Sequence, residues 1–199
     1  HTGRKDGILW TVKTQDNSSS VTGSSLFDFE GDGKVEVIYN DECFLRVYDG
    51  RTGTKLLEEE NTSRTAMEYP LVVDVDGDNN SEILVASNND QIVRDKCKAP
   101  GTTGIRVYGD SADLWVRSRP VWNQHAYSVT HVDDMGNIPS KMERNWDKPG
   151  LNNFRQNVQG EGLFLAPDLK AVSLTAKTFG CPAVLVLRAQ ISNVGSMGV

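Results

Sequence analysis

The fold is indicated most directly by Asp28-Phe29-Glu30-Gly31-Asp32-Gly33, which leads into Val35-Glu36-Val37-Ile38-Tyr39. Acidic residues and glycines come directly before a run of β-branched and aromatic residues, which is the pattern of a turn that leads into a β-strand. A second copy, Asp74-Val75-Asp76-Gly77-Asp78 before Glu82-Ile83-Leu84-Val85, begins 46 residues later (74 − 28). The chain is therefore predicted to repeat one β-rich unit.

A second element repeats together with the acidic loops. Leu45-Arg46-Val47-Tyr48 and Ile105-Arg106-Val107-Tyr108 lie 60 residues apart (105 − 45), and each is followed by a turn and a short apolar segment, 55–57 or 114–116. The extra residues of the second copy fall in the polar stretch 88–101, which we predict to be a surface loop.

Each copy is thus expected to contain four strands. Residues 8–10 fit the last strand of an earlier copy. A period of about 40–50 residues with four strands is typical of β-propeller blades, whereas a β-sandwich does not repeat in this way. We predict an all-β chain with partial propeller blades over residues 1–119.

A degenerate third copy follows in residues 120–165. The segment 126–129 aligns with 68–71, which places Val132, Asp134 and Gly136 opposite the three Asp residues of the second loop. Because two of the three carboxylates are missing, we expect no strong calcium site in this copy.

The two acidic loops carry carboxylates at the same positions, 1, 3, 5 and 9. They are Asp28, Glu30, Asp32 and Glu36 in the first loop, and Asp74, Asp76, Asp78 and Glu82 in the second. Four carboxylates within nine residues repel one another unless a cation neutralises them. Calcium accepts six to eight oxygen ligands in irregular geometry, whereas magnesium demands a tighter octahedron, so calcium is the expected ion in two sites.

The backbone of these loops is predicted to assist in binding the ion. The carbonyl oxygens of Lys34 and Asn80, at position 7, would each add a ligand, and Gly33 and Asn79, at position 6, accept left-handed backbone conformations. The pattern is not an EF-hand, because position 12 holds Tyr39 or Val85 in place of a bidentate Glu and the flanks are strands. The alternative interpretation is a pair of acidic surface turns without metal.

These motifs resemble FG-GAP/VCBS-type repeats, the calcium-binding blades of integrin-like β-propellers. The resemblance covers about residues 8–120. It implies a structural calcium in each loop, held by the eight carboxylates named above, an extracellular or cell-surface location, and a role in adhesion or carbohydrate binding. Two residues depart from the usual pattern, namely Glu30 in place of Asp or Asn, and Asn79 in place of Gly.

The remaining segments indicate two further regions. Residues 120–165 resemble the segment that follows the propeller in large secreted bacterial repeat proteins. The aromatic residues around Trp122 and His125 either fix a domain junction or form a sugar-binding surface. Residues 166–199 alternate in two runs, 169–174 and 184–191, with a turn at 193–196, which resembles the first two strands of an Ig-like, CARDB-type domain.

Three cysteines are present, Cys43, Cys97 and Cys181, and none lies in a zinc-binding pattern. A Cys43–Cys97 disulfide and three buried free thiols are both compatible with the sequence. Because the first residue is His1 and the last strands have no sheet to join, we expect a piece of a longer chain, completed by its missing parts or by identical subunits.

Composition excludes several classes of function. With 27 acidic against 21 basic residues and a net charge of −6, a nucleic-acid partner is not expected. No apolar run reaches the roughly 18 residues that a membrane span requires. Since no GxSxG, HExxH, P-loop or GxGxxG motif occurs, we predict a structural or adhesion module with a carbohydrate or surface-protein partner. The alternative is part of a calcium-dependent polysaccharide-degrading enzyme.

Overall fold

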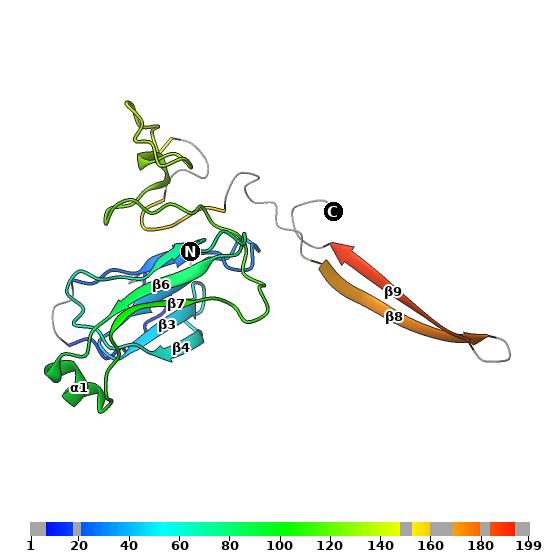
Figure 1. Cartoon of the computed structure of the whole chain (residues 1–199), viewed down its shortest axis with the longest axis horizontal. Coiled ribbons are helices and arrows are strands. Elements are labelled where there is room, and N and C mark those ends of the chain that lie inside the picture. The colour runs from blue at the N-terminus through cyan, green and yellow to red at the C-terminus, as the bar shows by residue number, and fades with distance from the viewer. Residues whose placement is uncertain (1–6, 18–20, 148–152, 160–168, 180–183, 194–199) are drawn as a thin grey trace. The chain divides into compact units, whose positions relative to one another are not determined.

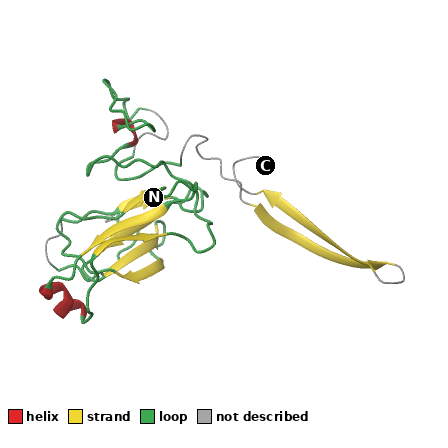
Figure 2. Ribbon diagram, in the orientation of Figure 1, coloured by secondary structure: helices red, strands yellow, loops and turns green. Residues whose placement is uncertain are grey.

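The computed structural model describes residues 7–17, 21–147, 153–159, 169–179 and 184–193 (Figure 1). The chain divides into two compact units, residues 1–160 and 161–199. Most of the regular structure is antiparallel β-sheet, as Figure 2 shows in yellow, so the predicted all-β class is confirmed. No closed propeller is present among these residues.

The first repeat forms one four-stranded sheet, here called sheet A. It contains β1 (Ser25–Phe27), β2 (Glu36–Asn40), β3 (Phe44–Asp49) and β4 (Lys55–Glu60). The strands follow one another in the order β1-β2-β3-β4, each antiparallel to the next. The first acidic loop connects β1 with β2, as its position between two apolar runs predicts.

The second repeat forms sheet B, which has three strands in the order β5-β6-β7. They are β5 (Leu71–Val73), β6 (Glu82–Ser87) and β7 (Gly104–Tyr108). The second acidic loop connects β5 with β6, so both loops occupy the same place in their sheets.

Residues 88–101 are not the simple loop that their polarity predicts, because they contain the helix α1 (Gln91–Cys97). Asp90 caps this helix, and its carboxylate accepts a 2.9 Å hydrogen bond from the backbone N–H of Ile92. Val93 is the buried residue of this helix. One buried apolar residue and one capping residue show no helical periodicity, so this seven-residue helix could not be predicted from the sequence.

The hydrophobic core lies between the two sheets. Sheet A contributes Ile38, Leu45 and Val47, and sheet B contributes Val72, Ile83 and Val85, all at most 4% exposed. Burying each such side chain contributes about 1.5–3 kcal/mol. This packing holds the two acidic loops on a rigid framework.

Two predicted strands are absent. Residues 114–116 form no strand because Trp115 packs on Phe29 at a ring distance of 4.4 Å and the N–H of Val116 donates to the Phe29 carbonyl at 2.9 Å. Residues 8–10 form no strand either, and the indole of Trp10 donates to the carbonyl of Gly50 at 2.9 Å. In both segments a half-buried aromatic side chain directs the backbone away from a sheet edge.

The segment after sheet B is held by buried polar side chains. Arg119 donates to the carbonyl of Val132 at 2.7 Å and to the hydroxyl of Tyr127, which is fully buried. A short 3-10 helix, η1 (Val129–His131), follows. Residues 126–129, which align the predicted third copy (120–165) with the second, form no strand, because Tyr127 joins a hydrogen-bond network in place of a ladder.

The second unit contains a hairpin of β8 (Leu169–Phe179) and β9 (Val184–Asn193). Both predicted strands are present and longer than expected. The predicted turn at 193–196 lies almost entirely outside the described residues, as does Cys181. Among the described residues, no helix is long and apolar enough to cross a membrane.

Candidate functional site

Three carboxylates converge in the first acidic loop. Oxygen atoms of Asp28, Glu30 and Glu36 lie within 4.8 Å of one another. Asp32 does not join them, because its carboxylate forms an ion pair with Lys34 and accepts a 2.8 Å bond from the Lys34 backbone N–H. The first loop thus brings together three of the four predicted carboxylate ligands.

The second loop brings together a different three. Oxygen atoms of Asp74, Asp76 and Asp78 lie within 4.8 Å of one another. The carboxylate of Glu82 lies outside this cluster and accepts a 2.8 Å hydrogen bond from the backbone N–H of Val75. A shift of side-chain conformation at Glu82 or Asp32 is needed before all four predicted carboxylates of a loop can meet.

Left-handed backbone conformations close both loops. Gly33 has φ +81° and Asn79 has φ +76°, so the predicted conformation at position 6 is confirmed. Two positions earlier, Gly31 (φ +67°) and Gly77 (φ +80°) also have positive φ. Since only Gly and, at greater cost, Asn adopt this conformation readily, the residue choice at both positions follows from the curl of the loop.

Backbone N–H groups hold the aspartates toward the inside of the curl. Asp28 accepts hydrogen bonds from Asp32 (3.1 Å) and Gly33 (2.8 Å). In the second loop, Asp74 accepts from Gly77 at 2.7 Å and Asp78 accepts from Asn80 at 2.7 Å. The same hydrogen bonds stabilise plain acidic turns, so they do not by themselves distinguish a metal site from such a turn.

The electrostatics of the first loop show uncompensated negative charge. Burial raises the pKa of Glu36 to about 7, assisted by the charges of Glu30 and Asp28 and opposed by its hydrogen bond from Phe29. Loss of hydration also raises the pKa of Glu30. In contrast, the hydrogen bond from Lys34 lowers the pKa of Asp32. A cation beside Glu36 would stabilise its ionised carboxylate and so offset the free-energy cost of burying that charge.

The second loop shows the same effect more weakly. Burial raises the pKa of Glu82, with further contributions from the charges of Asp76 and Asp78. Oxygen-only ligands of high negative charge suit a hard cation, and both clusters could hold one. The participation of the Lys34 and Asn80 carbonyls stays a prediction. In the degenerate third copy, Asp134 forms an ion pair with Arg119.

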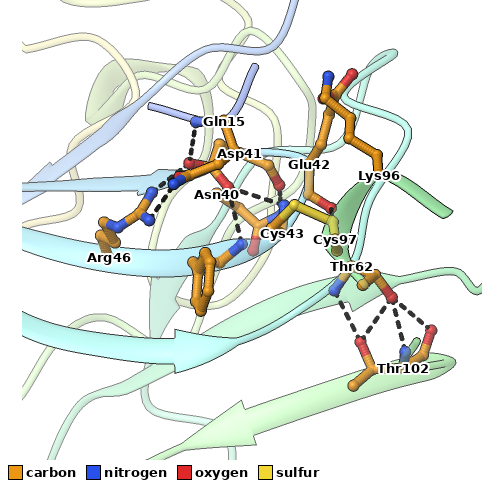
Figure 3. The surroundings of a disulfide bond; sticks show 11 residues. Gln15, Asn40, Asp41, Glu42, Cys43, Arg46, Thr62, Lys96, Cys97 and Thr102 are labelled. Carbon is orange, nitrogen blue, oxygen red and sulfur yellow. Dashed lines mark hydrogen bonds and ion pairs between the residues drawn. A yellow bond between two sulfur atoms is a disulfide. The ribbon is translucent and has the colours of Figure 1, made fainter. Parts of the chain in front are cut away.

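The structure joins Cys43 and Cys97 in a disulfide with a Cα–Cα distance of 5.4 Å (Figure 3). The bond links the β2–β3 turn of sheet A with the end of α1, which belongs to the second repeat. Nearby, Thr62 and Thr102 exchange hydrogen bonds of 2.9 and 2.7 Å, each backbone N–H donating to the other hydroxyl. The two repeats are therefore fastened covalently as well as by the core.

The aromatic residues around Trp122 line a hollow of about 380 Å³ beside sheet B. Trp122 stacks on Tyr127 at 4.4 Å, and its indole donates to the hydroxyl of Tyr69 at 3.2 Å. His125 contacts the ring of Tyr69 edge-on at 4.7 Å. These contacts pack the segment onto the second repeat. The predicted junction role stays a prediction. The sugar-binding alternative stays a prediction.

No protein-family model and no curated protein sequence matches this chain. Among solved structures, the chain is similar to the crystal structure of the V. cholerae biofilm matrix protein Bap1, with 31% sequence identity and a TM-score of 0.60. The match covers 68% of this chain and 22% of the Bap1 chain, so this chain spans about a fifth of that protein. It supports the all-β class of the domain, and leaves the FG-GAP/VCBS assignment untested.

Proposed function

We propose that this chain is an extracellular, calcium-binding structural or adhesion module of a larger secreted or surface protein. The observation that carries the proposal is the similarity to a biofilm matrix protein at 31% identity over 68% of the chain. The two carboxylate clusters give the module its ion-binding chemistry.

Calcium, when bound, supplies positive charge at the place where the loop carboxylates repel one another. The groups that hold it are those that converge, Asp28, Glu30 and Glu36 in one loop and the three Asp residues in the other. Each loop connects the first two strands of its sheet, so fixing the loop also fixes the register of those strands. An ion that binds the folded loop better than the unfolded chain adds stability that grows with its concentration.

The arrangement of the repeats supports blades of a β-propeller of the FG-GAP/VCBS type. Equivalent strands of sheets A and B follow the same order, and the core lies between the two sheets. The Cys43–Cys97 disulfide supports an oxidising, extracellular location. In this proposal the second unit begins an Ig-like domain, and the remaining blades come from the same longer chain or from identical subunits.

A binding module is favoured over a polysaccharide-degrading enzyme by the chemistry of the hollow beside Trp122. Glu68 is the carboxylate among its lining residues. Burial opposes ionisation of Glu68, but hydrogen bonds from Ser63, Met67 and Ala66 outweigh it and lower its pKa. A general acid for glycoside cleavage needs a raised pKa. We therefore propose a non-catalytic role, with a carbohydrate or a surface protein as partner.

The experiment that tests the proposal is thermal unfolding of the chain in excess EGTA, in a calcium titration and in a matched magnesium titration. We expect the melting temperature to rise with calcium and to rise less with magnesium, because the loops offer irregular oxygen cages. Identical melting curves in EGTA and in calcium would show that the loops are plain turns.

A further inference from the structure

The helix α1 belongs to an insertion in the hairpin of β6 and β7. The two strands pair as far as Ser87 and Gly104, and residues 88–103 lie between these partners. In the first repeat the equivalent strands, β2 and β3, are joined by the short turn 41–43. The second repeat therefore carries a segment that the first repeat lacks.

Both ends of this insertion are anchored at Thr62. The backbone N–H of Asn88 donates to the carbonyl of Thr62 at 2.9 Å. At the other end, the backbone N–H groups of Thr62 and Thr102 each donate to the hydroxyl of the other residue, at 2.9 and 2.7 Å (Figure 3). Thr62 is buried, and hydrogen bonds shielded from water are electrostatically stronger. The base of the insertion is thus held without the help of the disulfide.

Between these anchors, weak non-covalent contacts hold α1 to the rest of the unit. Among the described residues, no strand packs along this helix, and Val93 is its buried residue. Lys96 forms an ion pair with Glu42, and Asp90 forms an exposed one with Arg64 at 2.8 Å. Exposed ion pairs contribute little to stability, and a helix of this length is marginal in isolation.

The Cys43–Cys97 disulfide is therefore the main restraint on α1. Its two cysteines differ in access to solvent. Cys43 is 4% exposed in the β2–β3 turn, whereas Cys97 is half-buried at the end of α1. A thiolate that opens a disulfide must reach one of its sulfur atoms, and exposed disulfides are more labile than buried ones. The accessible point of attack is thus Cys97.

We propose that Cys97 is a site of thiol–disulfide exchange, at which a small thiol such as glutathione reduces the bond to Cys43 and frees α1 while both sheets stay folded. The thiolate of the small molecule attacks the sulfur of Cys97 and forms a mixed disulfide there. The bond to Cys43 breaks, and Cys43 leaves as a thiolate that takes up a proton.

A second small thiolate completes the reduction. It attacks the small-molecule sulfur of the mixed disulfide, and Cys97 leaves as a thiolate that is protonated in turn. Two small thiols are oxidised to one disulfide, and the two cysteines gain the electrons and the protons that the small thiols lose.

Release of α1 changes how the two repeats are connected. The oxidised chain links the turn 41–43 of sheet A covalently to the second repeat. The reduced chain keeps the core and the hydrogen bonds of Thr62, and the insertion becomes a loop closed at its base. This inference does not depend on the proposed calcium role, since neither cysteine lies in an acidic loop.

The first test locates the point of attack. The unaltered 199-residue chain is treated with glutathione under native conditions, the exchange is quenched with acid, and the modified cysteine is identified by peptide mass. We expect the first mixed disulfide on Cys97, with Cys43 as a free thiol. A first mixed disulfide on Cys43, or a bond that glutathione opens only when the chain unfolds, would overturn the proposal.

The second test measures the release of α1 by hydrogen exchange and mass spectrometry. After reduction, the amides of residues 91–97 should exchange about tenfold faster or more, while those of β2 and β6 keep their protection. The variant Cys43→Ser/Cys97→Ser should exchange like the reduced chain, with or without glutathione. Unchanged protection of α1 after reduction, or an equal loss in the strands, would contradict a local release.

Lys96→Gln is the matched control, because it removes the ion pair with Glu42 and keeps the disulfide. Its α1 should keep the protection of the unaltered oxidised chain. A loss of protection as large as that caused by reduction would show that the ion pair, and not the covalent bond, holds the helix, and the proposal would fall.

Discussion

Glu82 accepts a 2.8 Å hydrogen bond from the backbone N–H of Val75, seven residues earlier in the chain. The same bond, at 3.0 Å, joins Glu36 to Phe29 in the first loop. The glutamate at position 9 therefore closes each loop onto its own second residue, and its carboxylate lies where the strand begins. This bond explains why a buried acid is tolerated in both sheets, since a carboxylate that is hydrogen-bonded costs less to bury.

Replacing one converging carboxylate in a loop is expected to remove the stabilisation that calcium provides through that loop, and to leave the contribution of the other loop in place. Glu30→Gln and Asp76→Asn keep the size of the side chain and delete one charged ligand from each cluster. Each should reduce the calcium-induced rise in melting temperature, and the double variant should abolish it. In EGTA, Glu30→Gln should melt at or slightly above the unaltered chain, because it relieves repulsion with Asp28 and Asp32.

The matched control for these variants is Asp110→Asn. Asp110 also organises an acidic turn, accepting hydrogen bonds from the N–H groups of Ala112 and Leu114 at 3.0 Å, and belongs to neither cluster. Its calcium response should equal that of the unaltered chain. An equal loss of response in Asp110→Asn would show that calcium acts on surface charge in general.

The raised pKa of Glu36, about 7, predicts a pH dependence of stability. A carboxyl with a folded pKa above its unfolded value binds more protons in the folded state, so its stabilising contribution is complete below the unfolded pKa and is lost as pH rises through the folded pKa. The metal-free protein should therefore melt at a lower temperature at pH 8 than at about pH 5. Melting in EGTA across this range, with Glu36→Gln as the variant that flattens the curve, measures the effect.

Calcium should reverse this trend. Because the ion binds the ionised carboxylate, its affinity should increase as pH rises through about 7. Isothermal titration at both ends of the pH range measures the affinity. A calcium affinity that is independent of pH between these limits would contradict the placement of Glu36 in the site.

Reduction of the Cys43–Cys97 disulfide should destabilise the folded unit. The bond closes a loop with a sequence separation of 54, for which loss of the crosslink costs roughly 4 kcal/mol through the entropy of the unfolded chain. The variant Cys43→Ser/Cys97→Ser should show the same loss in urea unfolding as the reduced protein. If the reductant lowers the stability of the double variant as well, the effect does not arise from this bond.

Asn157 should be essential to the attachment of the segment after sheet B. Its side-chain amide donates to the carbonyls of Val72 and Arg119, both at 2.8 Å, and its oxygen accepts from Tyr127 at 3.0 Å. Asn157→Ala leaves these buried groups unpaired, which should cost about 2–4 kcal/mol of unfolding free energy.

The control for this variant is Asn137→Ala, which removes a 3.0 Å hydrogen bond to Asp133 in an exposed turn. We expect a change of less than about 0.5 kcal/mol there. If Asn157→Ala and Asn137→Ala lowered the free energy of unfolding in urea by similar amounts, the buried hydrogen bonds of Asn157 would contribute no more than an exposed one.

Local patterns in the sequence were sufficient to predict the acidic loops and most strands. The alternation and β-branched content of 35–39 and 82–85 specify strands, and the glycines and Asn79 specify the curl before them. These features depend on neighbours within a few residues, so they can be predicted without knowledge of the fold. Residues 114–116 and 8–10 failed as predicted strands because Trp115 and Trp10 make contacts with residues far away in the chain.

Two equivalent acidic loops between strands could be predicted from the sequence, because spacing and residue type are local properties. Which carboxylates meet depends on the three-dimensional structure. It placed Glu36 with Asp28 and Glu30, left Glu82 outside the cluster of the second loop, and brought Cys43 to Cys97 across the two repeats. It also buried Leu45 and Val47 of sheet A while leaving their equivalents in the repeat, Ile105 and Val107 of sheet B, exposed. The physical reason is that convergence and burial depend on packing between segments that no local pattern places together.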